Sequence, residues 1–99
     1  MRMLLKFSMQ VEKANHSIKN GNLPKLMQGI MGELKPEAAY FTTMEGMRTG
    51  LIFFDLKDTT LMPSIAEPLF MELEAEVKWY PVMNPDDLKA GLELASKKF

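Results

Sequence analysis

Two stretches of the chain alternate apolar and polar residues with a period of two. They run from Arg2 to Met9 and from Glu74 to Val82. Because successive side chains of a strand point to opposite faces, this period predicts a β-strand in each stretch. The polar side of the second stretch is charged, which suits the edge of a sheet. The apolar sides carry Met3, Leu5, Phe7 and Met9 in the first stretch and Ala75, Val77 and Trp79 in the second.

Two further β-rich runs, residues 38–43 and 48–55, are joined by a short segment that contains Glu45-Gly46. A connection this short that contains Gly predicts a β-hairpin. With Glu45-Gly46 as its two-residue turn, Tyr40 lies opposite Leu51. One face of the hairpin then carries Ala38, Tyr40, Thr42, Thr49, Leu51, Phe53 and Asp55, and the other carries Ala39, Phe41, Thr43, Arg48, Gly50, Ile52 and Phe54.

Apolar residues at helical spacing predict a helix over residues 11–34, in two parts. We expect the break near Gly21, because Gly adopts the left-handed conformation that ends helices. Asn22 is then expected to cap the second part, with Pro24 in its first turn.

The same spacing predicts a second helix over residues 61–73, capped by Asp58-Thr59-Thr60. Pro68 is expected to kink this helix or to delay its start, because proline lacks a backbone N–H. Asn84, followed by Pro and two acidic residues, predicts the start of a short C-terminal helix.

The order strand, helix, strand, strand, helix, strand predicts one α+β domain over residues 1–99. Its four-stranded antiparallel sheet is expected to carry the two helices on one face. The segment Leu51–Phe54 is apolar on both sides, although a strand with one wet face would alternate. Both faces of the sheet must therefore be covered. We expect a second copy to cover the other face in a homodimer; the alternative is the C-terminal helix folding back.

Four short runs of the chain, spread over nearly its whole length, resemble a family of short bacterial proteins of unknown function. That family is similar to the ferredoxin-like dimeric α+β barrel superfamily, whose members include cofactor-free monooxygenases, lactone isomerases, haem enzymes and ligand-sensing domains. The resemblance implies a ferredoxin-like fold and a dimeric barrel, but assigns no catalytic residue. The runs are NGNLPK at 20–25, LKPEAAYF at 34–41, AEPLF at 66–70 and VMNP at 82–85.

The composition of the chain limits the classes of partner and of reaction that we expect. A net charge of −1 argues against nucleic acid as a partner, because nucleic-acid affinity depends on positive charge. The chain has no Cys, which excludes disulfides and thiolate chemistry. We find no signal peptide and no apolar run long enough to span a membrane, and expect a cytoplasmic protein. The ten Met residues are scattered and are interpreted as packing residues rather than a copper site.

Six residues are candidates for ligand binding, and each also has a structural interpretation. His16, the only His, is either a general base or an exposed helix residue, and one His does not make a metal site. Tyr40, Phe53 and Asp55 share one hairpin face, which suits either a small-molecule pocket or a dimer interface. Arg48 binds an anionic ligand or pairs with an acid.

The sixth candidate, Trp79, walls a cleft or packs in the core. We therefore predict a small-molecule-binding homodimer without metal or cofactor. Its pocket is expected between the sheet and its helices, lined by Tyr40, Phe53, Trp79 and His16. Cofactor-free oxidation or isomerisation is the chemistry that the resemblance implies if the protein is an enzyme, and the alternative is a non-catalytic interaction or ligand-sensing module. Asp86-Asp87 are explained by helix capping rather than by a metal.

Overall fold

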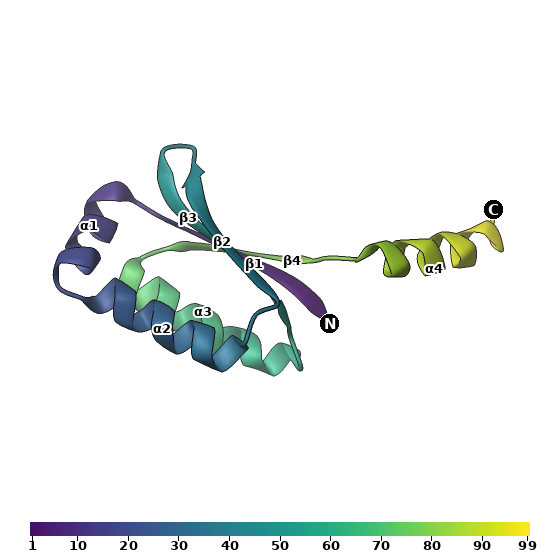
Figure 1. The fold of residues 1–99 in the computed structure, drawn as a ribbon, viewed down its shortest axis with the longest axis horizontal. Helices are drawn as coiled ribbons and strands as arrows, with labels where there is room; N and C mark the ends of the chain where they lie inside the picture. The colour runs from purple at the N-terminus through teal and green to yellow at the C-terminus, as the bar shows by residue number, and fades with distance from the viewer.

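The structure, a computed structural model, describes residues 1–99. It confirms an α+β architecture with four antiparallel strands and four α-helices (Figure 1). In chain order the elements are β1 (Arg2–Met9), α1 (Val11–Lys19), α2 (Asn22–Leu34), β2 (Ala38–Met44), β3 (Met47–Asp55), a short 3-10 turn (Thr59–Leu61), α3 (Met62–Leu73), β4 (Glu76–Pro81) and α4 (Pro85–Ser96).

The strands lie in the order β2-β3-β1-β4, and every neighbouring pair is antiparallel. β1 and β3 are therefore the central strands, and β4 is an edge strand as its charged side predicts. β1 runs parallel to β2 with β3 between them, and β3 runs parallel to β4 with β1 between them. Helices α1 and α2 make the first of these crossovers and α3 makes the second, so this topology is compatible with a ferredoxin-like fold.

The hairpin between β2 and β3 has the predicted register, with Tyr40 opposite Leu51 and Thr43 opposite Arg48. Its turn residues, Glu45 and Gly46, have φ angles of 53° and 77°. A turn with two residues at positive φ matches the twist of antiparallel strands, which explains why Gly occupies the second position.

The first helical region breaks at Gly21, which has a φ of 82°, as predicted. The prediction that Asn22 caps α2 was wrong. The Asn20 side chain instead accepts a hydrogen bond from the Asn22 backbone N–H, at 3.0 Å. An Asn side chain readily bonds the backbone two residues further along the chain, and here this fixes the turn that precedes α2.

Helix α3 begins at Met62 and continues through Pro68, so of the two predicted outcomes the late start was wrong and the kink stays a prediction. A proline in a helix removes the hydrogen bond to the carbonyl four residues earlier, here that of Ser64. Ser64 lies on the exposed side of α3. The buried side of α3 keeps Ile65, Leu69 and Leu73 in the core.

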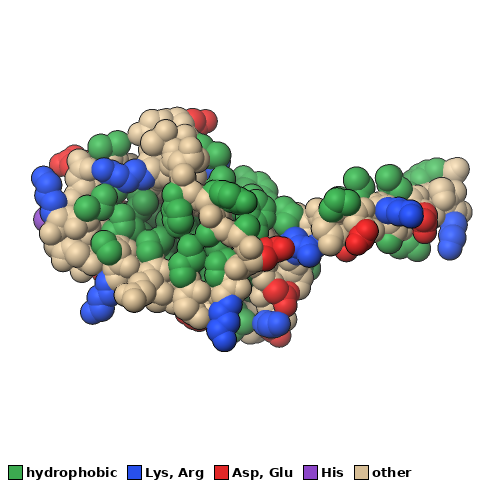
Figure 2. Space-filling view, viewed as in Figure 1, with side chains coloured by type: hydrophobic (Ala, Val, Ile, Leu, Met, Phe, Trp, Pro, Cys, Tyr) green, Lys and Arg blue, Asp and Glu red, His purple; other side chains and the backbone are tan.

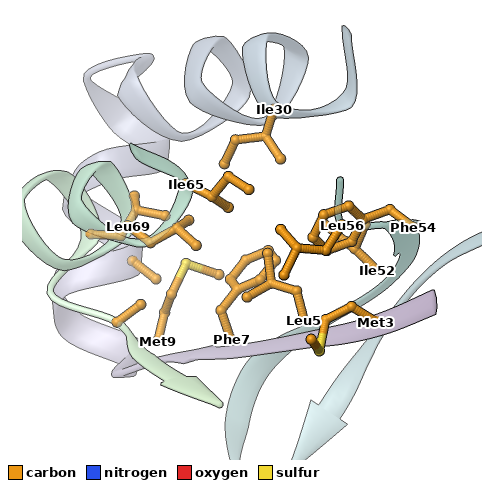
Figure 3. Close-up of a cluster of buried hydrophobic side chains, with 13 residues drawn as sticks. Met3, Leu5, Phe7, Met9, Ile30, Ile52, Phe54, Leu56, Ile65 and Leu69 are labelled. Atoms are coloured by element: carbon orange, nitrogen blue, oxygen red, sulfur yellow. The ribbon is translucent and has the colours of Figure 1, made fainter. Parts of the chain in front are cut away.

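The core lies between one face of the sheet and the helices. Leu5 and Phe7 of β1 are fully buried, together with Ile52 of β3. Figure 3 shows Leu5 and Phe7 rising from β1 toward the helices, with Ile52 beside Phe54 and Leu56, and Leu69 of α3 in the same cluster. The alternation of β1 explains this layer, because its odd-numbered residues all face the helices.

Helix α4 starts as predicted, at a capping box. The Asp87 backbone N–H donates to Asn84 Oδ1 at 2.8 Å, and the Asn84 backbone N–H donates to Asp87 Oδ2 at 3.1 Å. The helix then projects away from the sheet, and none of its residues is buried (Figure 1). It therefore does not fold back over its own sheet. No helix in the chain has the length and apolar character needed to cross a bilayer.

Candidate functional site

One face of the sheet carries no helix, and we call it the open face. Cross-strand pairing arranges its side chains in three rows, each running across all four strands. Row one is Ala38, Phe53, Leu4 and Tyr80; row two is Tyr40, Leu51, Lys6 and Lys78; row three is Thr42, Thr49, Ser8 and Glu76.

Row one makes the open face apolar at the centre of the sheet. Phe53 and Leu4 pair across the two central strands and are only half-buried. Leu51 of row two extends this apolar surface along β3. On the opposite face of β3, Ile52 and Phe54 are buried under the helices. β3 is thus apolar on both faces, as its sequence predicts, and its own chain covers only one of them.

Row two places two lysines side by side. Lys6 and Lys78 are directly opposite each other on β1 and β4. Neither ammonium group makes an ion pair with an acidic side chain. Like charges at paired positions of a sheet repel each other and are destabilising. A negative group between them is attracted to both ammonium groups and offsets that repulsion. Row two therefore offers a place for an anion beside an apolar surface.

The two central residues of row three are hydrogen-bonded to each other. The Ser8 and Thr49 hydroxyls lie 3.0 Å apart, and Thr49 Oγ1 donates to the Met47 carbonyl at 3.1 Å. Since the Thr49 hydrogen is used in that bond, Ser8 is the donor to Thr49. Both side chains are buried and fully paired. They are structural, whereas Thr42 and Glu76 at the two ends of row three are exposed and belong, with rows one and two, to the surface available to a partner or ligand.

The predicted site residues fall on different surfaces. Tyr40, Phe53 and Asp55 lie on the open face, as the hairpin register predicts. Arg48 and Trp79 lie on the helix-bearing side of the sheet, because each is an odd number of residues away from an open-face position on its strand.

The side chains of Trp79 and Arg48 make structural contacts. Trp79 packs against Phe54, with ring centroids 6.2 Å apart. Arg48 Nη1 donates to the Val11 carbonyl at 3.5 Å. The expected pocket between sheet and helices is therefore not formed by Tyr40, Phe53, Trp79 and His16, because the first two face away from the helices.

His16 is exposed on α1. It borders an open, polar groove of about 630 Å³ between α1 and the end of α3, where Lys13 pairs with Glu74. Another open groove, of about 440 Å³, lies between α2 and α3 and is lined by Leu26, Ile30 and Pro68, among others. Nowhere in the chain do three His, Asp or Glu side chains gather as a metal site. Neither groove contains Tyr40, and neither reaches the open face.

Asp55 is the last residue of β3 and lies opposite Arg2, the first residue of β1, at one end of the open face. Its carboxylate lies 2.9 Å from Lys57 Nζ and 2.7 Å from the Met1 amine. These contacts, first that with Lys57 and then that with the amine, lower the pKa of Asp55 from its ordinary 3.8 to about 2. Asp55 is therefore a charged anchor for the strand ends, and it also borders an open groove of about 600 Å³ lined by Arg2 and Lys35, among others.

We expect the Asp55 ion pairs to make stability depend on pH in the acid range. Because its pKa is lower in the folded state, its contribution is present above pH 3.8 and is lost as the pH falls through about 2. Asp55→Asn should flatten the dependence of the denaturation midpoint on pH across this window, by a small amount because the pair is exposed. An unchanged slope in the variant would show that the pairs do not form in solution.

Comparison of the chain with known protein families, curated proteins and solved structures finds no match. The family resemblance, the bacterial origin and the dimeric state therefore stay predictions. The sequence did identify the open face through the two-sided apolar pattern of β3. It missed the pairing of Lys6 with Lys78, because only the alignment of β1 with β4 brings these two residues together.

Proposed function

We propose that the protein is a homodimer of ferredoxin-like subunits, of the dimeric α+β barrel type, in which a second copy covers the open face. The single observation that supports this most strongly is the apolar centre of that face, formed by Leu4, Leu51 and Phe53. An apolar patch on a central strand is unfavourable in water, and two-fold association is the commonest way to remove it.

We further propose that the covered face binds a small molecule with an apolar body and a negative group. A second copy that covers row two would desolvate Lys6 and Lys78, and an unpaired buried charge costs several kcal/mol. A carboxylate between the two ammonium groups offsets that cost, while Phe53 and Leu4 contact the apolar body. A small aromatic carboxylate has both features.

This binding is tested with 2-naphthoate as the probe, by NMR titration of the backbone amides. We expect the shifts to map to β1, β3 and β4. Replacing Lys6 or Lys78 by Met should weaken binding about tenfold, because a hydrogen bond to a charged group contributes ~1.5–3 kcal/mol. Lys19→Met, an exposed lysine on α1, is the matched control and should leave the affinity unchanged. Equal affinities in all three variants, or shifts confined to the helices, would contradict the proposal.

The open face favours binding over catalysis. It brings together no pair of groups suited to acid–base transfer, since the Tyr40 hydroxyl makes no hydrogen bond to a side chain and His16 lies on α1, away from this face. We therefore place the non-catalytic, ligand-sensing role first. Cofactor-free oxidation or isomerisation would depend on Tyr40, and Tyr40→Phe would then abolish turnover while leaving the affinity for 2-naphthoate intact.

A further inference from the structure

Helix α4 has an apolar stripe that no part of its own chain covers. Leu88, Leu92 and Ala95 recur at i, i+4 and i+7 and therefore lie on one side of the helix. No residue of the helix is buried, and Figure 2 shows its hydrophobic side chains exposed along the projection. An isolated helix of 12 residues is marginal in water, because helices in proteins gain most of their stability from packing. α4 therefore needs a surface to pack against.

The sheet of the same chain does not provide that surface. The Val82 N–H donates to the Arg2 carbonyl at 3.1 Å, and Arg2 Nη1 donates to Asp87 Oδ2 in the first turn of α4, also at 3.1 Å. These contacts hold the start of the helix, which continues outward from the end of β4 and away from the sheet (Figure 1). A partner must therefore meet α4 beyond the end of the sheet.

We propose that α4 packs against α4 of a second copy in an antiparallel pair, with the two sheets at opposite ends of the pair. A two-fold axis that passes between Gly91 and Leu92 brings the two apolar stripes together. Leu92 of each copy then lies against Gly91 of the other, and Leu88 of each copy lies against Ala95 of the other. The helices overlap along about 18 Å, and neither sheet has to approach the other.

The order of large and small residues on the stripe favours the antiparallel direction. In an antiparallel pair each leucine meets a small residue, whereas a parallel pair would place Leu88 on Leu88 and Gly91 on Gly91, with a gap at the second position. A glycine in the interior of an exposed helix is destabilising relative to alanine, and the space beside Gly91 is empty. That empty space is where Leu92 of the second copy packs.

The charged residues beside the stripe fit the same direction. Lys89 and Glu93 lie on one flank of the stripe, and the antiparallel register brings Lys89 of each copy level with Glu93 of the other. Neither side chain forms an ion pair within its own chain. On the other flank, the register brings Asp87 of one copy near Lys98 of the other. The pair is therefore complementary in charge along both sides of its apolar contact.

Phe99 and a groove at the start of α4 extend this contact. The Phe99 N–H donates to the Ala95 carbonyl at 3.2 Å, so the helical path continues to Phe99, whose side chain is 99% exposed. In the antiparallel register, Phe99 of one copy lies level with Pro85 of the other. Pro85 borders an open groove of about 500 Å³, which is lined by Pro81, Met83 and Leu88, among others. Phe99 therefore enters the groove of the second copy.

This contact uses a different surface from the proposed homodimer and does not rest on it. Stable interfaces involve ~20–30 residues on each side, and α4 supplies 12. We therefore expect the α4 pair to form at near-millimolar concentrations of the chain and to be absent at micromolar concentrations. Where both contacts form, α4 joins one homodimer to the next.

The absence of Cys from the chain allows a direct disulfide test. Chains with Leu88→Cys are mixed at near-millimolar concentration with differently tagged chains that carry Ala95→Cys, in a glutathione redox buffer. We expect a disulfide-linked product that contains both tags. Leu94→Cys is the control for Ala95→Cys, because Leu94 is adjacent in the sequence but lies off the stripe, and it should give at least tenfold less mixed product.

The same experiment distinguishes the two helix directions. In the antiparallel pair the two Leu88 residues are ~10 Å apart along the helices, which is too far for a disulfide. Chains with Leu88→Cys alone should therefore remain unlinked. A disulfide between two chains at position 88, or a mixed product no greater than that of the Leu94→Cys control, would overturn the proposal.

Charge reversal tests the register. Lys89→Glu alone and Glu93→Lys alone should each weaken association of the chain with itself about fivefold, because exposed attractive pairs become repulsive. An equal mixture of the two variants should restore it, since each Glu at one position then faces a Lys at the other. Repulsion within each helix is the same before and after mixing. Equal association in the separate and mixed solutions would therefore contradict the register.

Association is measured by the concentration dependence of the α4 amide shifts in chains that carry Phe53→Glu, which removes the apolar centre of the open face. In this background Leu92→Glu should raise the dissociation constant at least tenfold, and Leu94→Glu, at matched exposure, should leave it unchanged: Leu92 is 61% exposed and Leu94 is 62% exposed. Equal effects of the two changes overturn the α4 pair and leave the homodimer standing. A native chain that is monomeric at micromolar concentration overturns the homodimer and leaves the α4 pair standing.

Discussion

Replacing Phe53 with Glu is expected to convert the dimer into monomers, with a dissociation constant at least ~100-fold higher than that of the native chain. Phe53 pairs with Leu4 at the centre of the open face, where the second copy would exclude water. Removing a carboxylate from water there costs several kcal/mol, which Lys6 in the neighbouring row offsets only in part, and ~2.7 kcal/mol corresponds to a factor of 100. Sedimentation velocity over a concentration series measures the change.

Phe41→Glu provides the matched control for this experiment. Phe41 is in the same hairpin, but it lies on the other face of the sheet and away from the proposed interface. The same Phe-to-Glu change should therefore leave the dissociation constant within a factor of about two, and circular dichroism should show both variants folded. If Phe41→Glu separates the subunits and Phe53→Glu does not, the interface lies on the helix-bearing face of the sheet, which contradicts the proposal.

Phe7→Ala is expected to lower the free energy of unfolding by about 3–5 kcal/mol, the usual cost of removing a buried aromatic side chain. Phe7 is fully buried on β1, and its ring lies directly over Gly50 of β3. The cost combines lost burial with a cavity that the flanking sheet and α3 fill only partly. Urea denaturation followed by tryptophan fluorescence measures it, since Trp79 lies beside the core.

A substitution at Gly50 tests the same contact between Phe7 of β1 and Gly50 of β3. A methyl group at position 50 would overlap the Phe7 ring, so Gly50→Ala should cost about 1–3 kcal/mol on its own. In the Phe7→Ala background the overlap is gone, and the same change should cost almost nothing. Gly29→Ala is the control: Gly29 is exposed in the interior of α2 and has open space around it, so alanine there should add about 0.5–1 kcal/mol. Additive effects of the changes at positions 7 and 50 would refute the close packing of these residues.

Local signals predicted the elements of the fold because each is decided by neighbouring residues. Positive φ at Glu45 and Gly46 is needed by the hairpin itself, so the register of β2 and β3 follows from the turn. The break at Gly21 and the start of α4 at Asn84 also depend on adjacent residues. Helix capping was less predictable, since both Asn20 and Asn22 are suitable residues and only the structure shows which side chain bonds the backbone.

The site depends on contacts that are distant in the sequence, and its prediction was correspondingly weaker. Tyr40, Phe53 and Asp55 were placed together because they share one hairpin. Trp79 was assigned to the same pocket, although its position on β4 turns it toward the helices, where it meets Phe54. The alternation in residues 74–82 places Trp79 with Ala75 and Val77 on the apolar side of its strand. Residues 51–54 are apolar on both faces, so the sequence did not show which face of the hairpin meets the helices.

The sequence also did not predict the direction in which α4 leaves the sheet. An amphipathic helix after an edge strand can fold back or project, and both outcomes have the same apolar spacing. The deciding contacts link Arg2 with Asp87 and with Val82, across more than 75 residues of chain. These contacts leave the open face uncovered within one chain.

The mass of the native chain in solution shows directly whether a second copy covers the open face, on which both the homodimer and its ligand site depend. Sedimentation equilibrium of the unmodified protein over a range of micromolar concentrations should give twice the chain mass of 11.3 kDa. A single species of 11.3 kDa at every concentration would show that the apolar centre of β3 stays exposed to water, and would contradict the homodimer.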